Sequence, residues 1–129
     1  MGMENNTVRK KLNEIERILK KFVPDLLKFL ENNLLNHEFF TTQWIITIFA
    51  NSVKPNNLFK VWDLAFVYGW KFLNNFIVAI LLTFKQVIME YEIYHLSTFM
   101  RNLLKSDLFD QSFLHILQLS FDIINEFEN

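Results

Sequence analysis

The chain has 129 residues, a formal net charge of −1, 51% apolar residues and 16% aromatic residues, which suits one domain or part of one. A net charge near zero offers no basic field to collect nucleic acid, so a nucleic-acid partner is not expected. The absence of cysteine excludes a disulfide scaffold, a thiol nucleophile and a zinc site of cysteines, and it fits a reducing compartment.

Two helices are predicted at the start of the chain. Apolar residues recur at steps of four and three from Val8 to Phe22, the pattern of an amphipathic helix. Asn6 or Thr7 can cap its start. Pro24 ends this helix and begins the second, because proline disfavours helical geometry in the residue before it and suits a first helical turn.

The first few residues are expected to lie outside the domain. Residues 1–11 are polar as a stretch and open with Met-Gly-Met, which suggests that residues 1–6 are an added or disordered start to a segment of something longer. The domain is therefore predicted to span residues 7–127. No secretory signal is recognised in the polar opening.

The middle of the chain is the most apolar part. Residues 38–50 predict a buried helix, with a strand as the minor alternative because of an Ile-Ile-Thr-Ile run. Pro55 begins a further helix that is expected to end at Gly69, a residue free to take positive φ. Residues 70–89 predict a long buried helix. Its apolar run is far short of the roughly 20 residues that a bilayer requires, so no transmembrane segment is expected.

Two more helices complete the predicted fold, at 91–105 and 110–127. Neither an internal repeat nor a low-complexity linker is visible. The sequence therefore predicts an all-α bundle of six to seven helices.

No constellation of side chains indicates an active site. His37, His95 and His115 share no ligand spacing, so each is interpreted as a surface or capping histidine. Glu90 and Glu92 lie on different sides of any helix and form no acid–base pair. Phosphate-cradling loops need glycines, which are almost missing. We therefore expect no catalytic, cofactor-binding or metal-binding residue, and no cofactor.

The three tryptophans have a structural interpretation. Phe40, Trp44 and Ile48 recur at helical spacing, as do Leu58, Trp62 and Phe66. Such stripes are normally packed in a core, so Trp44 and Trp62 are expected to be largely buried, each with an acceptor for its indole N–H. For Asp63, a buried hydrogen-bond anchor is favoured over an ordinary surface acid.

The order of the aromatic segments adds a resemblance. Pro-Asp-Leu at 24–26 is followed by FFTTQW at 39–44, FA at 49–50, KVWD at 60–63 and YGW at 68–70. Over roughly residues 8–125 this order resembles the second half of a TBC domain, the domain of GTPase-activating proteins for Rab GTPases. Lys60 stands where the family usually has arginine. The motif residues, all expected to be structural, are Pro24, Phe40, Trp44, Phe49, Trp62, Asp63, Gly69 and Trp70.

The resemblance implies an all-helical fold and a mechanism that this chain lacks by itself. In the family, an arginine in Ile-x-x-Asp-x-x-Arg and a glutamine in Tyr-x-Gln act as two catalytic fingers. Arg9, Arg17 and Arg101 are the arginines present, and none has Ile and Asp at the matching positions. No glutamine has Tyr two places before it. The resemblance therefore implies a C-terminal lobe that is inert alone, supports the catalytic lobe and adds part of the GTPase-binding surface.

Partners, place and alternatives follow from the same resemblance. It implies a Rab-type GTPase partner, an N-terminal TBC lobe in a longer parent, a role in vesicle trafficking, and a cytoplasmic location peripheral to endomembranes. A bare lobe face predicts a homodimer through the first helices. The alternatives are a finger-less TBC-like scaffold that binds Rabs or other partners without catalysis, and an unrelated helical adaptor.

Overall fold

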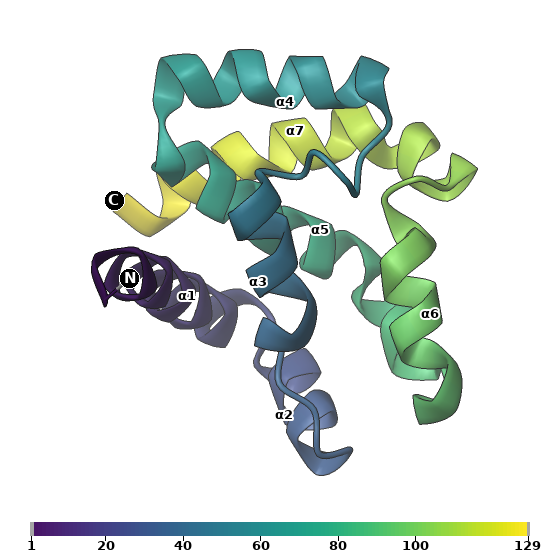
Figure 1. Ribbon diagram of the computed structural model, residues 1–129. Helices are drawn as coiled ribbons and strands as arrows, with labels where there is room; N and C mark the ends of the chain where they lie inside the picture. Colours follow the sequence, from purple (N-terminus) through teal and green to yellow (C-terminus); the bar gives the residue numbers. More distant parts are fainter. Residues whose placement is uncertain (1, 129) are drawn as a thin grey trace.

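The computed structural model describes the backbone of residues 2–128 and the side chains of residues 7–92 and 94–123. Within residues 2–128 the chain forms seven helices and no strand (Figure 1). The prediction of an all-α bundle is thereby confirmed, and the strand alternative for residues 38–50 is excluded. The helices are α1 (Gly2–Phe22), α2 (Pro24–Asn32), α3 (Glu38–Thr47), α4 (Pro55–Tyr68), α5 (Trp70–Glu90), α6 (Ile93–Leu103) and α7 (Asp107–Glu128).

The helix α5 is the centre of the bundle. It packs against α7, α1, α4 and α2, and it runs through the middle of the molecule in Figure 1. Every residue from Phe72 to Leu81 is buried, which requires cover on all sides of the helix. Among the described residues, α5 is also the one helix long and apolar enough to cross a membrane, with a mean hydropathy of 1.7, so the expectation that its apolar run is too short is wrong. Because 67% of that apolar window is buried inside the fold, it fits a core helix.

Proline and glycine mark the helix boundaries where the sequence predicts them. Pro24 and Pro55 occupy the first turns of α2 and α4. Gly69 joins α4 to α5 with φ +76° and ψ −162°, a region that essentially only glycine enters. The prediction of an unusual backbone at Gly69 is confirmed.

The start of α1 differs from the prediction. The helix begins at Gly2, so Asn6 and Thr7 lie inside it and are not its cap. The backbone of residues 2–6 is helical, and the expectation of an added or disordered start in residues 1–6 stays a prediction. The domain limits at residues 7 and 127 stay predictions.

The end of α3 and the start of α7 also differ from the predictions. The helix α3 stops at Thr47 because Ile48 and Phe49 take φ values of +49° and +65°. This left-handed corner turns the chain so that Phe49 becomes buried. The helix α7 starts at Asp107 and not at residue 110, because the hydroxyl of Ser106 accepts a hydrogen bond of 3.2 Å from the Phe109 N–H as a helix cap does.

Aromatic rings link the layers of the core. Trp44 in α3 lies between Phe40 and Phe49, at ring-centroid distances of 5.6 and 5.8 Å. Phe49 meets the edge of Phe76 in α5 at 5.3 Å, and Phe76 meets Phe113 in α7 at 6.4 Å. Edge-to-face and offset contacts of this kind add stability beyond the burial of their area. One aromatic path therefore joins three helices.

Candidate functional site

The motif residues divide into a buried and an exposed group. Phe40, Trp44 and Phe49 are buried in the core, as packing predicts. Pro24 is exposed at the start of α2. The acceptor expected for the Trp44 N–H stays a prediction.

Trp62 is not buried as predicted. Its exposed fraction is 38%, because α4 turns Leu58 and Val61 into the core and leaves the Trp62 side of the helix at the surface. The predicted acceptor is present, since the indole N–H donates a hydrogen bond of 2.9 Å to the carbonyl of Ile48. Trp62 therefore ties α4 to the left-handed corner after α3.

The predicted burial of Asp63 is also wrong. Asp63 is exposed on α4, since it follows Trp62 on the helix and lies away from the stripe of Leu58 and Val61 that packs inward. Phe66 departs furthest from the expected core stripe, with an exposed fraction of 92%. The Leu58–Trp62–Phe66 spacing thus describes a row that runs from the core out to solvent.

These exposed side chains gather into one surface, here named the aromatic face: Ile48, Trp62, Phe66 and Trp70. Together with Ala65, Gly69 and Leu73 they line a shallow groove of about 320 Å³. The ammonium of Lys11 lies over the ring of Trp70, 4.3 Å from the ring centroid. This cation–π contact holds α1 beside the groove. A row of exposed large apolar groups on a small domain is typical of a protein-binding surface.

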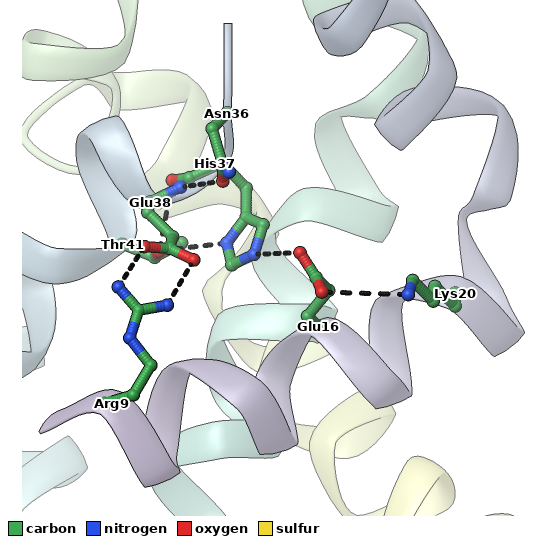
Figure 2. A network of polar contacts seen from close by, with 7 residues as sticks. All are labelled: Arg9, Glu16, Lys20, Asn36, His37, Glu38 and Thr41. Carbon is green, nitrogen blue, oxygen red and sulfur yellow. Dashed lines mark hydrogen bonds and ion pairs between the residues drawn. The ribbon is translucent and has the colours of Figure 1, made fainter. Parts of the chain in front are cut away.

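A second arrangement joins α1 to the start of α3 and is drawn in Figure 2, here named the His37 cluster: Arg9, Glu16, His37, Glu38 and Thr41. Arg9 donates two hydrogen bonds of 2.8 Å to the two carboxylate oxygens of Glu38. On the other side of the imidazole, Nε2 of His37 lies 3.6 Å from Oε1 of Glu16. His37 precedes the first residue of α3, so the cluster connects helices that are distant in sequence.

Electrostatics in the His37 cluster follow from burial and pairing. Desolvation lowers the pKa of the buried His37 imidazole, and the charges of Glu16 and Glu38 oppose that effect. Hydrogen bonding by Arg9 holds the pKa of Glu38 below its usual value. The same hydrogen bonds raise the pKa of Arg9. The imidazole therefore favours its neutral form, while Glu38 favours its charged form.

The sequence predicts His37 at a surface or at a helix cap, and the structure confirms the cap position and contradicts the surface one. The residue does occupy the position that caps α3, but its side chain is only 1% exposed. Glu16 lies in α1 and His37 lies just before α3, so no local spacing could reveal their proximity. His95 and His115 are exposed, as predicted.

Comparison with known families identifies the fold. A family model for the Rab-GTPase-TBC domain matches residues 1–89. The chain belongs to the Rab-GTPase-TBC domain family. The match runs from α1 nearly to the end of α5 and contains every motif residue and the whole aromatic face. Neither a curated protein nor a solved structure matches the chain.

Membership of the TBC family confirms the resemblance seen in the sequence. A TBC domain is a Rab GAP-type domain, and it interacts with Rab GTPases. Both the aromatic face and the His37 cluster lie within the TBC match. The helices α6 and α7 follow it.

Proposed function

We propose that this chain is the C-terminal lobe of a TBC domain, which backs a finger-bearing lobe, adds part of the GTPase-binding surface and does not itself accelerate GTP hydrolysis. The single observation that carries the proposal is the order of the motif segments from residue 24 to residue 70 in a chain without either finger motif. An arginine finger is worth about 10³ to 10⁵ in rate, so its absence decides the activity of an isolated lobe.

The placement of the arginines supports this proposal. A finger must extend from the protein to reach the γ-phosphate of a bound nucleotide. Both terminal nitrogens of Arg9, Nη1 and Nη2, instead donate hydrogen bonds of 2.8 Å to Glu38. Arg17 forms an ion pair of 2.6 Å with Glu14 on the same helix. Arg101 lies on α6, beyond the matched residues.

The aromatic face supports a role in protein binding. Phe66 is 92% exposed and Trp62 38% exposed within a region that matches the TBC family. Apolar side chains of this size are favourable at an interface because aromatic groups supply most of the binding energy in small contact areas. The proposal places the lobe in the cytoplasm, peripheral to endomembranes through its partners, in the regulation of vesicle trafficking.

Single-turnover GTP hydrolysis by a panel of Rab GTPases tests the catalytic part of the proposal. We expect the hydrolysis rate of every Rab to be the same with and without a saturating amount of the chain. A TBC domain that carries both finger motifs serves as the positive control. Stimulation of any Rab by this chain contradicts the inert-lobe assignment.

A second candidate, a finger-less scaffold, is equally compatible with the pairing of both α1 arginines with carboxylates of the same chain. The two candidates differ in the longer parent protein. A lobe predicts that the parent accelerates GTP hydrolysis, whereas a scaffold predicts that the parent binds a GTP-loaded Rab and leaves the rate unchanged. The same single-turnover assay on the parent separates them.

Self-association of the isolated chain is a further part of the proposal. An apolar surface normally covered by another lobe favours a homodimer or a tight contact at high concentration. The exposed rings of α4 favour the aromatic face for this contact over the first helices, which the sequence suggested. Light scattering at increasing concentration tests it, and a monomer throughout the range contradicts it.

A further inference from the structure

The hydrogen bonds of Thr41 determine which nitrogen of His37 carries the proton. The Thr41 hydroxyl donates to the backbone carbonyl of His37 at 3.0 Å. The same oxygen lies 3.0 Å from Nδ1 of His37. A hydroxyl has one proton, so its oxygen accepts in the second contact. With the hydroxyl proton on the His37 carbonyl, Nδ1 carries the hydrogen of the neutral imidazole and Nε2 presents a lone pair.

That lone pair points at a carboxylate. Nε2 lies 3.6 Å from Oε1 of Glu16, which is too long for a hydrogen bond. The nitrogen is buried and has no hydrogen-bond partner within the described side chains, and the imidazole is 1% exposed. A buried imidazole lone pair that faces an oxygen of the half-buried Glu16 carboxylate is an arrangement that a cation between the two atoms stabilises.

We propose that Glu16, His37 and Glu38 bind one divalent transition-metal ion, with Zn²⁺ as the best fit. One ligand atom from each residue lies within 4.8 Å of the other two. Zinc bonds of about 2.0–2.2 Å in a tetrahedron place neighbouring ligand atoms about 3.4 Å apart. The His37–Glu16 distance of 3.6 Å is close to this value, and a modest movement of Glu38 completes three ligands. The fourth position is open to water.

The donor set selects the class of metal. An imidazole nitrogen with two carboxylates suits Zn²⁺ and its transition-metal neighbours, whereas Mg²⁺ and Ca²⁺ prefer oxygen ligands alone. The ion would cross-link α1, which carries Glu16, to the start of α3. Its role would therefore be to fix these two helices together.

Outer contacts orient His37 and Glu16 for an ion, and Arg9 holds Glu38 beside them. Thr41 orients the imidazole through Nδ1, and Arg9 grips Glu38 with two hydrogen bonds of 2.8 Å. Each carboxylate oxygen of Glu38 keeps a second lone pair for a metal. Lys20 lies 3.7 Å from Oε2 of Glu16 and so leaves Oε1, which faces His37, available. Supporting contacts of this kind orient metal ligands in established sites.

Metal titration of the tag-free chain, stripped with a chelator, tests the proposal. We expect saturable binding of one Zn²⁺ per chain in competition with a metal indicator, and no comparable binding of Mg²⁺. Co²⁺ provides a spectroscopic test, because a site of low coordination number gives visible absorption. Zinc should also raise the thermal midpoint of the wild-type chain, since an ion bound only by the folded state stabilises it.

Two ligand variants and two matched controls assign the site. His37→Asn removes Nε2 while its amide N–H can still donate to Thr41, so the fold should survive. Glu16→Gln removes one charge at a half-buried position. Each should weaken Zn²⁺ binding at least about tenfold. Glu14→Gln on the same helix and His95→Asn on α6 should leave the affinity unchanged.

Circular dichroism establishes that each variant is helical before its affinity is compared. Unchanged zinc affinity in a folded His37→Asn or Glu16→Gln chain overturns the proposal. So does the lack of one-to-one binding by the wild-type chain, or equal binding of Mg²⁺ and Zn²⁺. None of these measurements involves a Rab GTPase, so their outcome is independent of the proposed TBC function.

Discussion

The helices α3 and α4 carry similar aromatic spacing but use it differently. Phe40 and Trp44 in α3 are 8% and 3% exposed, whereas Trp62 and Phe66 in α4 are 38% and 92% exposed. The α3 rings continue through Phe49 into α5, while α4 reaches the core through a different stripe. Helical spacing therefore identifies which residues share a face, and the neighbouring elements decide whether that face is covered.

The largest difference in stability between the two helices is expected at Trp44. Trp44→Ala should reduce the free energy of unfolding by about 3–5 kcal/mol, because it removes a large buried side chain and leaves a cavity between Phe40 and Phe49. Urea unfolding monitored by circular dichroism measures the loss. A reduction below about 1 kcal/mol would show that the core around α3 collapses readily or that Trp44 is not packed as described.

The corner between α4 and α5 should give the next largest effect. Gly69→Ala and Gly69→Val should each reduce the free energy of unfolding by about 1–3 kcal/mol, because φ +76° is unfavourable for a side-chain-bearing residue. A Cβ at this position would meet nothing within 4 Å, so the cost comes from the backbone. Urea unfolding of both variants measures it, and an unchanged midpoint in either contradicts the assigned conformation.

Trp62 should contribute less to stability than Trp44, and mainly through its hydrogen bond. Trp62→Phe keeps an aromatic ring but loses the N–H that donates to the carbonyl of Ile48 at 2.9 Å. We expect the free energy of unfolding to fall by about 0.5–1.5 kcal/mol. Chemical denaturation measures the change, with Phe59→Leu on the same exposed side of α4 as the control. Equal losses in the two variants would mean that ring packing, and not the hydrogen bond, is responsible.

The smallest effect on stability is expected at Phe66. Phe66→Ala should change the free energy of unfolding by no more than about 0.5 kcal/mol, since the ring is already in solvent. Its effect should appear in partner binding, where loss of an aromatic anchor weakens affinity at least about tenfold. Affinity for a Rab GTPase or for the rest of the TBC domain, measured by calorimetry, tests this. Unchanged affinity for both removes Phe66 from the interface.

Much of the fold could be predicted because the prolines and glycines are few and lie at the ends of helices. Pro24 and Pro55 allowed two helix starts to be read directly, and Gly69 gave one end. The end of α3 could not be predicted, since Ile48 and Phe49 take positive φ without a glycine to signal it. Tertiary packing of Phe49 imposes that corner, and a single sequence carries no local mark of it.

The surfaces were harder to predict than the helices. Burial of Trp62 was expected from its helical spacing with Leu58 and Phe66, and burial of Asp63 from its place in the KVWD segment. Both expectations were wrong because an apolar helix such as α4 has no clear polar side, so its sequence does not show which stripe is buried. The His37 cluster was missed for a different reason. Its three charged members come from α1 and from the start of α3, and only the packing of those helices brings them together.

The left-handed pair after α3 has a consequence for engineering. A β-branched residue such as Ile48 is poorly suited to φ +49°, and the burial of Phe49 with the Trp62 hydrogen bond keeps it there. The chain therefore bears a cost in backbone conformational energy at Ile48, a partly exposed residue. Asparagine or glycine at position 48 should relieve this backbone penalty. A substitution in this bend is therefore expected to raise the free energy of unfolding without changing the packed core.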